Sequence, residues 1–263
     1  MKLLIDADFI VYKSCAAAEV DIDYGDDVIV VSSNFSDAMK NVHREIGRIR
    51  DQFAYFDSFG DIELTLYFSS SENFRKKIMP DYKGHRNRKK PCGYRRVIHE
   101  LASDYHLDRI EGLEADDAIG IAATTLREQG EMYSVVSPDK DLRQIPGMLY
   151  DFKEISEVTP EEGRKFHLLQ TLAGDNTDGY NGVSGFGMKK AYNYLEENGY
   201  TWKAVLEAFG DEEEALRNAR LAKILTKDDF DSEQLVPILW SPAADYRADS
   251  GTEFQDEAVG DAA

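Results

Sequence analysis

The sequence predicts an α/β protein with a mostly parallel sheet, helices on both faces of that sheet, and a helical region after it. Over residues 1–155, short apolar runs alternate with stretches whose apolar residues recur every three or four positions. This pattern is typical of strands joined by crossover helices. Beyond residue 155 the apolar spacing is helical. A chain of 263 residues is long enough to bury a sizeable core.

The predicted strands are short and mostly apolar. The first, Lys2 to Ile5, leads into a helix that begins near Asp8. Residues 20–33 contain Asp-Tyr-Gly-Asp-Asp followed by four β-branched residues, which indicates a hairpin inserted after this helix. Further strands are expected at Ile62–Phe68, Leu107–Ile110, Glu131–Val136 and Met148–Phe152.

The predicted helices are amphipathic. In residues 36–56, apolar side chains recur at three- and four-residue spacing, as expected of a helix that packs on a sheet. Thr159 followed by Pro160 is a favourable helix start. The remaining helices are expected over residues 94–105, 118–126, 160–172, 202–209 and 212–225, with one more after Lys190.

Composition excludes several classes of protein. The chain has no apolar run near 18 residues and no signal-peptide pattern, which predicts a soluble cytoplasmic protein without a membrane partner. Cys15 and Cys92 lie far apart without metal-ligand spacing and are expected to be thiols in a reducing compartment. The net charge of -19 argues against nucleic-acid binding by the surface as a whole.

The charge is unevenly distributed along the chain. Residues 72–96 contain ten Lys or Arg against two acids, with Phe74, Tyr82 and Tyr94 interleaved. Such a segment is often only a solvated surface, but positive charge combined with aromatic rings also suits a single strand of nucleic acid. Residues 241–263 are acidic and poor in large apolar side chains, which predicts a disordered tail.

Acidic residues gather where strands end and where one helix begins. Asp6 follows the first strand, and Glu114, Asp116 and Asp117 open a helix. Carboxylates in a first helical turn can simply cap amides and complement the helix dipole. Two more acids follow the strand that ends at Val136, and parallel strands bring their carboxyl ends to one edge of the sheet. This convergence favours a cation site over helix capping alone.

The acids expected to converge are Asp6, Glu114, Asp116, Asp117, Asp139, Asp141, Asp175 and Asp178. Two carboxylates about 4 Å apart repel by roughly 4 kcal/mol at an effective dielectric of 20, so this set could not stay fully ionised without cations. Oxygen ligands without convergent His or Cys favour Mg²⁺ or Mn²⁺ over zinc. Two such ions can activate a water and clamp the attacking and leaving oxygens of a phosphodiester.

A glycine-rich turn precedes the helix after Lys190. Gly182, Gly185 and Gly187 can present backbone N–H groups to a phosphate, and Lys189 and Lys190 follow directly. A glycine-rich turn is weak evidence by itself. It gains weight from the acidic segments that precede it.

Together these segments occur in the order and spacing of the flap endonuclease or 5′-nuclease family, which the chain resembles over roughly residues 2–225. Residues 80–86 and 175–180 look most similar to the stand-alone 5′-3′ exonucleases of short-tailed phages. The resemblance implies a PIN-like catalytic domain at 1–155 that includes a basic arch at 72–96. It further implies a helix-three-turn-helix (helix-hairpin-helix) DNA-binding region at 156–240.

The resemblance also implies roles for individual residues. It places two Mg²⁺ ions, one among Asp6, Glu114, Asp116 and Asp117 and the other among Asp139, Asp141, Asp175 and Asp178. The implied catalytic residues are Lys83, Arg86, Asp116 and Asp141. The implied DNA contacts are Arg75, Tyr82 as a stacking ring, Lys83, Arg86, Gly182, Gly185, Gly187, Lys189 and Lys190. A K⁺ ion is expected at the glycine turn.

The implied function is 5′-3′ exonuclease action on duplex DNA, and also on RNA in RNA–DNA hybrids and on 5′ flaps, during phage replication or DNA degradation in the host cytoplasm. The alternatives are a strictly structure-specific flap endonuclease and a non-catalytic DNA-binding scaffold. One residue departs from the family pattern: Ser70 stands where an Asp is usual, with Glu72 nearby. This departure implies a less tightly held first metal.

Overall fold

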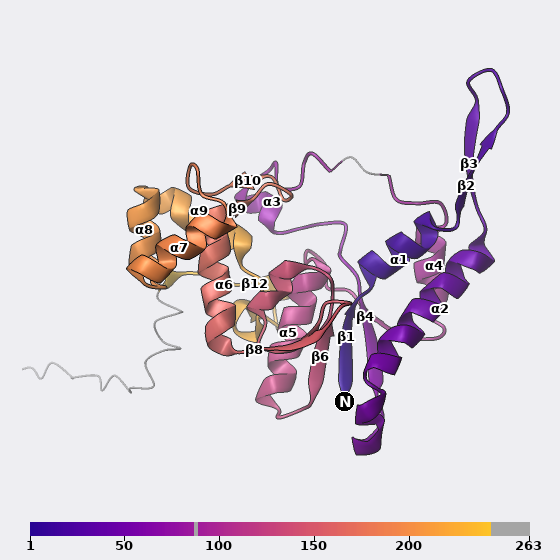
Figure 1. Ribbon diagram of the computed structural model, residues 1–263, viewed down its shortest axis with the longest axis horizontal. Coiled ribbons are helices and arrows are strands. Elements are labelled where there is room, and N and C mark those ends of the chain that lie inside the picture. Colours follow the sequence, from indigo (N-terminus) through magenta and orange to yellow (C-terminus); the bar gives the residue numbers. More distant parts are fainter. Residues whose placement is uncertain (87–88, 243–263) are drawn as a thin grey trace, which may run out of the picture.

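The computed structural model describes residues 1–86 and 89–242, and a six-stranded sheet lies at its centre (Figure 1). Along the sheet the strand order is β5-β4-β1-β6-β7-β8. The first five of these are parallel, and β8 runs antiparallel to β7. The bounds are β1 Lys2–Asp6, β4 Glu63–Tyr67, β5 His106–Asp108, β6 Tyr133–Val136, β7 Gly147–Tyr150 and β8 Ile155–Val158. The predicted α/β fold with a mostly parallel sheet is confirmed.

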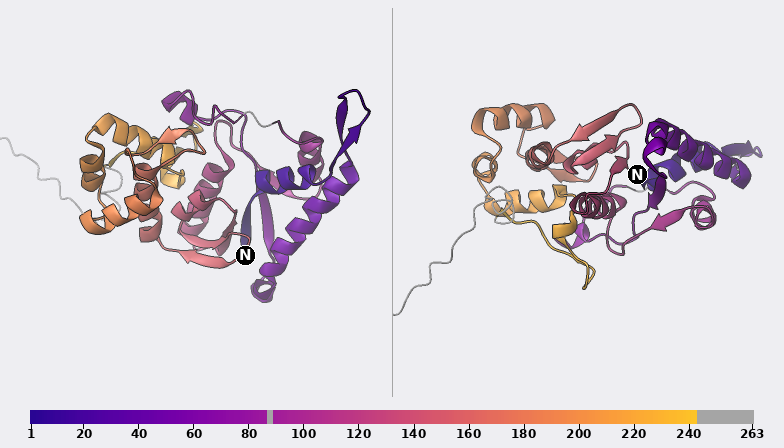
Figure 2. Two further views of the ribbon diagram at one scale, coloured as in Figure 1. Left: turned by 45° about the horizontal axis from the view of Figure 1, so that its top comes forward. Right: turned by 90° about the horizontal axis from the view of Figure 1, so that it is seen from below.

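Helices cover both faces of the sheet (Figures 1 and 2). Alternation along β1 explains this, because Leu3 and Ile5 point into one core while Leu4 points into the other. The first core is closed by α1 (Ala7–Ala16), α2 (Phe35–Gln52) and α4 (Tyr94–Leu101). The second core is closed by α5 (Ala115–Glu128) and the short 3-10 helix η2 (Lys140–Gln144).

A hairpin projects from the end of α1 (Figure 1). Its strands are β2 (Glu19–Asp23) and β3 (Ile29–Ser33), as the sequence predicts. Much of its apolar surface is exposed, with Val20 at 62% and Ile29 at 63%. The hairpin contributes little to the core, which explains why its sequence contains both acids and β-branched residues without a buried face.

The helical region packs around a core of its own. Figure 1 shows it beside α5, on the side of the sheet away from α2. Thr159 caps its first helix through a capping box with Glu162, and Pro160 occupies the first turn. The bounds are α6 Pro160–Ala173, α7 Met188–Asn198, α8 Trp202–Phe209 and α9 Glu212–Ala222. Short strand pairs β9 (Gly174–Asp175) with β10 (Tyr180–Asn181) and β11 (Phe230–Asp231) with β12 (Val236–Pro237) complete this part.

Several elements differ from the predicted ones. The helix at 36–56 ends at Gln52, and the 3-10 helix η1 (Ala54–Phe59) follows. β8 was not predicted, because a four-residue exposed strand between a turn and a helix cap has no clear apolar pattern. In its described residues the basic arch contains α3 (Arg75–Ile78) and the first turn of α4, and η3 (Lys227–Asp229) follows α9. No helix in the described part of the chain is long and apolar enough to span a membrane. The predicted tail lies outside the described residues beyond position 242.

Candidate active site

The carboxyl edge of the sheet positions the first group of acids. Asp6 ends β1, and the Ser137 hydroxyl after β6 donates a hydrogen bond of 2.9 Å to Asp6 Oδ2. The same serine oxygen accepts the Asp139 N–H at 3.1 Å, and Asp139 Oδ1 accepts the Asp141 N–H at 3.0 Å. Neighbouring parallel strands thus hold three acids in a fixed chain of hydrogen bonds.

The start of α5 supplies the second group. Glu114 is its N-cap residue, and Asp116 lies in its first turn. Five acids line one small cavity here: Glu114, Asp116, Asp139, Asp141 and Asp178. The structure therefore brings together acids from α5, from the loop after β6 and from the turn between β9 and β10. Sequence spacing predicted this meeting of separate segments.

The contacts of Asp117 argue against its predicted role as a metal ligand. The side chain is fully buried and forms a bidentate ion pair with Arg75, with N–O distances of 2.7 and 2.8 Å. Its oxygens also accept the backbone N–H groups of Leu225 and Glu114. Every lone pair that could reach a cation is engaged, so Asp117 is a structural acid.

The structure argues against the predicted DNA contact of Arg75, because this side chain is also buried and bonded inside the protein. Its side chain is 1% exposed. Besides Asp117, it donates to the carbonyl oxygens of Leu221 at 2.9 Å and Lys223 at 2.5 Å. No donor remains for a phosphate. Arg75 ties α3, at the foot of the arch, to the end of α9.

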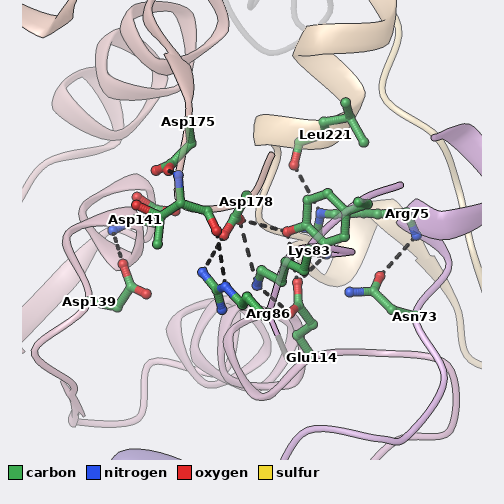
Figure 3. A network of polar contacts seen from close by, with 12 residues as sticks. Asn73, Arg75, Lys83, Arg86, Glu114, Asp139, Asp141, Asp175, Asp178 and Leu221 are labelled. Carbon is green, nitrogen blue, oxygen red and sulfur yellow. Dashed lines mark hydrogen bonds and ion pairs between the residues drawn. The ribbon is translucent and has the colours of Figure 1, made fainter. Parts of the chain in front are cut away.

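The arch turns two cations toward the acids (Figure 3). Lys83 Nζ forms an ion pair with Glu114 and lies 3.6 Å from Asp178 Oδ2. Arg86 Nη2 is 2.6 Å from Asp178 Oδ1, and Arg86 Nε donates to the Thr177 carbonyl at 3.0 Å. The backbone N–H of Lys83 donates to the Asp178 carbonyl at 2.8 Å. These contacts hold the arch against the turn between β9 and β10.

Tyr82 contradicts its predicted stacking role. The ring is 2% exposed, and its hydroxyl lies 2.8 Å from Asp178 Oδ2 and 3.1 Å from Glu114 Oε2. A ring covered to this extent has no free face for a nucleobase. Instead, the Tyr82 hydroxyl orients the carboxylates of Glu114 and Asp178.

Residues missed by the sequence analysis hold the remaining acids in place. Lys140 Nζ lies 3.0 Å from Asp175 Oδ2. Gln170, which is 1% exposed on α6, donates from Nε2 to Asp141 Oδ1. Gln144 in turn donates to Gln170 Oε1 at 2.6 Å. The only available signal was a polar side chain at a buried helix position, which sequence alone does not distinguish from a surface glutamine.

Burial and mutual repulsion shift the pKa values of the acids. Burial raises the pKa of Asp6 to about 7, and repulsion from Asp8 and Asp139 adds to the effect. Burial also raises the pKa of Asp141 to about 7 and raises that of Asp116 well above its usual range. Glu114 differs: burial opposes its charge, but Lys83 and Arg75 lower its pKa to about 2. Burial also raises the pKa of Asp178, in spite of its ion pairs with Lys83 and Arg86. Four of these five acids therefore resist ionisation, as expected of a buried cluster that lacks enough positive charge.

The donor set fits hard divalent cations. All the converging ligand atoms are carboxylate oxygens, which suit Mg²⁺ or Mn²⁺. Within residues 1–86 and 89–242, no three acids, histidines or cysteines are yet arranged as ligands of one ion. Lys83, Arg86 and Lys140 lie between the carboxylates and provide positive charge there. Binding of divalent ions would require these amines and the guanidinium to withdraw from the acids.

The glycine turn divides into two parts. Gly182 packs against the end of α6, where a Cβ would lie 2.1 Å from the Leu172 carbonyl oxygen. Gly185 has a φ of 72°, a left-handed conformation that favours glycine, and Gly187 is the N-cap of α7 with open space around it. Lys189 and Lys190 in the first turn of α7 are exposed. The open part and the two lysines can meet a phosphate, whereas Gly182 has a packing role.

Comparison with known proteins decides the family. A family model described as 5′-3′ exonuclease, N-terminal resolvase-like domain, matches residues 2–166. The chain belongs to this family. The exonuclease of Escherichia phage T7 is 29% identical over 193 residues, which cover 70% of this chain and 63% of that protein. The match therefore spans less than two thirds of the length of this phage exonuclease.

Two solved structures share the fold. The T5 5′-exonuclease with bound divalent metal ions (zinc) has a TM-score of 0.58 at 17% identity, covering 84% of this chain and 88% of that one. A bacteriophage T5 flap endonuclease in a pseudo-enzyme-product complex with DNA and metal ions has a TM-score of 0.57, also at 17% identity, covering 85% of this chain and 89% of that one. At this identity the likeness establishes the α/β fold with its helical region.

Ser70, which departs from the 5′-3′ exonuclease family pattern, does not point at the acids. Its hydroxyl donates to Glu111 Oε1 at 2.8 Å and accepts the Glu72 N–H at 3.2 Å. Asp8, which was not among the predicted site residues, lies near enough to Asp6 to repel it. It accepts the Ser69 N–H at 2.8 Å and raises the pKa of Asp6. The carboxylate expected after β4 is thus absent, and an acid from α1 lies beside that position.

Proposed function

We propose that the protein is a divalent-metal-dependent 5′-3′ exonuclease that hydrolyses phosphodiester bonds from the 5′ ends of duplex DNA. The observation that carries the proposal is the meeting of Asp116, Asp139 and Asp141 with the arch cation Lys83 around one cavity. Membership of the 5′-3′ exonuclease family supports the same activity. A scaffold without catalysis would gain nothing from the burial and mutual repulsion that raise the pKa values of Asp116 and Asp141.

The residues that would hold two metal ions are Asp6, Glu114, Asp116, Asp139, Asp141, Asp175 and Asp178. When bound, two Mg²⁺ or Mn²⁺ ions supply an activated water and neutralise charge on the phosphate. Asp116 and Asp141 are proposed as the catalytic ligands, because both line the cavity and burial raises the pKa of both, so that their ionised forms gain most from a bound cation.

The chain's own side chains orient the reacting groups. Lys83 and Arg86 are proposed to leave Glu114 and Asp178 and to bind the scissile phosphate. The negative charge of the phosphate would replace that of the two carboxylates as their partner. Ser137 and Gln170 keep Asp6 and Asp141 in place through hydrogen bonds. These contacts fix the ligands before substrate arrives.

The proposed architecture follows the same assignment. Residues 1–155 form a PIN-like catalytic domain with the arch at 72–96, and residues 156–240 form a helix-three-turn-helix region. The open glycines Gly185 and Gly187, with Lys189 and Lys190, are proposed to bind duplex backbone beside a K⁺ ion. The likeness to a flap endonuclease structure with DNA supports this placement of the duplex.

The proposed substrates are duplex DNA with a 5′ end, RNA in RNA–DNA hybrids and 5′ flaps. Because the phage T7 relative is an exonuclease, the proposed setting is phage replication or DNA degradation in the host cytoplasm. Phosphate contacts release counterions, so DNA binding should weaken steeply as salt is raised.

The test is digestion of 5′- and 3′-labelled blunt duplexes with Mg²⁺, beside a 5′-flap duplex. Early release of the 5′ label from the blunt duplex supports exonuclease action, whereas cleavage of the flap alone would favour a structure-specific endonuclease. Asp141→Asn should abolish cleavage and retain duplex binding, and Asp151→Asn, at a partly exposed acid after β7 that does not line the cavity, serves as its control. Turnover retained by Asp141→Asn would refute the mechanism.

A further inference from the structure

A second cavity lies beside the acidic cluster, at the ends of β4 and β5 and against α4. Its volume is about 520 Å³, which falls in the range of roughly 300 to 1,000 Å³ common for ligand sites. Ser69 to Ser71, which follow β4, line it together with Tyr94 and Arg95 of α4. None of its lining residues lines the cavity of the acids. It is a separate site, and we call it the cationic pocket.

The cationic pocket carries an excess of positive charge. Lys90, Arg95 and Arg109 line it, against Asp8 as its single carboxylate. Lys90 contacts the ring and hydroxyl of Tyr94. Among residues 1–86 and 89–242, neither Arg95 nor Arg109 forms an ion pair or hydrogen bond with an acid, although the protein as a whole is strongly acidic. Guanidinium groups without acidic partners around a concave surface are suited to a phosphate.

Asp8 does not neutralise these cations. One of its oxygens accepts the Ser69 N–H at 2.8 Å, and the other accepts the Tyr94 hydroxyl. Asp8 also stands two residues after Asp6 and repels it. The Asp8 side chain therefore lies at the border of the cationic pocket that is nearest to Asp6.

The position of the cationic pocket relative to the proposed duplex site follows from the arrangement of α7, β1 and α4. Figure 1 shows α7, which begins at the glycine turn, and α4, which lines the pocket, on opposite sides of β1. The acidic cluster lies between them, at the end of β1. If the glycine turn holds the duplex on one side of the cluster, a strand that crosses the cluster reaches the cationic pocket on the other side. For an enzyme that acts from a 5′ end, as proposed above, this part of the strand is its 5′ side.

We propose that the cationic pocket binds a phosphate of the DNA strand on the 5′ side of the cleaved bond. This inference rests on the proposed nuclease function. The phosphate has two possible sources with the same chemistry: the terminal monoester of a 5′-phosphorylated end, or the first internal diester of a 5′ flap. In both cases Arg95 and Arg109 supply the charge-assisted hydrogen bonds.

The test compares charged and uncharged substrates. One pair is a blunt duplex with a 5′-phosphate or a 5′-hydroxyl; the other is a 5′-flap duplex with a normal or a methylphosphonate linkage at the first flap position. For the wild type we expect the charged member of at least one pair to bind about tenfold more tightly, a difference of about 1.4 kcal/mol. The Arg95→Ala, Arg109→Ala double variant should lose this difference.

The control is the Arg48→Ala, Arg217→Ala double variant, which removes two exposed arginines of α2 and α9 and should keep the wild-type preference. A preference for the 5′-phosphate identifies the monoester, and sensitivity to the methylphosphonate identifies the diester. Equal discrimination by the wild type and the pocket variant, or none by either, would overturn the proposal.

Fluorescence anisotropy in the presence of a chelator measures binding separately from cleavage. If the wild type cleaves neither duplex, the proposed nuclease function fails, while the anisotropy comparison still decides whether the pocket binds phosphate. Thermal unfolding of both double variants checks that they are folded, as expected for substitutions at exposed residues.

Discussion

Replacing Arg75 by methionine separates the structural role found here from the DNA contact that the sequence suggested. Arg75→Met keeps the apolar stem but removes the guanidinium that pairs with the fully buried Asp117. The carbonyl groups of Leu221 and Lys223 also lose a donor. Removing one partner of a buried ion pair costs about 3 to 5 kcal/mol, because the other charge stays buried and unpaired. We expect the free energy of unfolding to fall by about 4 kcal/mol.

Urea unfolding followed by circular dichroism measures this loss. The Asp117→Leu variant and the Arg75→Met, Asp117→Leu double variant complete a cycle, whose coupling should reach at least about 2 kcal/mol. Lys76→Met, at an exposed position of the same short helix, should change stability by less than about 0.5 kcal/mol. A loss below about 1 kcal/mol in Arg75→Met, together with weaker binding of duplex DNA, would show that Arg75 contacts DNA and that the reasoning is wrong.

Three further predictions follow from the same structure. Gln170→Leu removes the amide that orients Asp141 and should weaken Mn²⁺ binding, measured by calorimetry, by about tenfold or more; unchanged affinity would mean that the amide has no orienting role. Gly182→Ala should lose at least about 2 kcal/mol of stability in urea, because its Cβ would meet the Leu172 carbonyl, whereas Gly187→Ala, in open space, should lose less than about 1 kcal/mol. Burial lowers the pKa of His167 to about 4 from an ordinary 6.5. Between these two pH values the unfolded state binds more protons than the folded state. His167 therefore lowers the free energy of unfolding as the pH falls from 6.5 to 4. On the order of 3 kcal/mol is at stake, and the wild type should lose stability relative to His167→Gln over this range; a constant difference between the two would contradict the prediction.

The fold was largely predictable from the sequence because its signals are local. The apolar run from Lys2 to Ile5 and the helical spacing in residues 36–56 each predict which side chains are buried, independently of the rest of the chain. β8 was missed because its burial is slight, and its pairing with β7 depends on the position of a neighbouring strand. Such pairing cannot be read from four residues.

The site was predictable as a place but only partly as a set of contacts. Spacing puts Glu114, Asp116 and Asp117 in one turn, but it does not say which of them faces a buried cation. That depends on Arg75, which comes from a distant segment. A signal was present, since Arg75 and Ile78 share one face of α3 and Ile78 packs in the core. The positive charge of the arch concealed this signal.

The ion pairs that hold the arch have a consequence for how the protein matures. Lys83 and Arg86 serve as counterions that belong to the chain itself, so Glu114 and Asp178 can be charged in the folded state without any divalent ion. Folding and the proposed binding of metal ions would then be separate events, unlike in small metal-dependent domains that are unfolded until they are loaded. On this basis the amount of folded protein would not depend on free Mg²⁺, and only the proposed activity would.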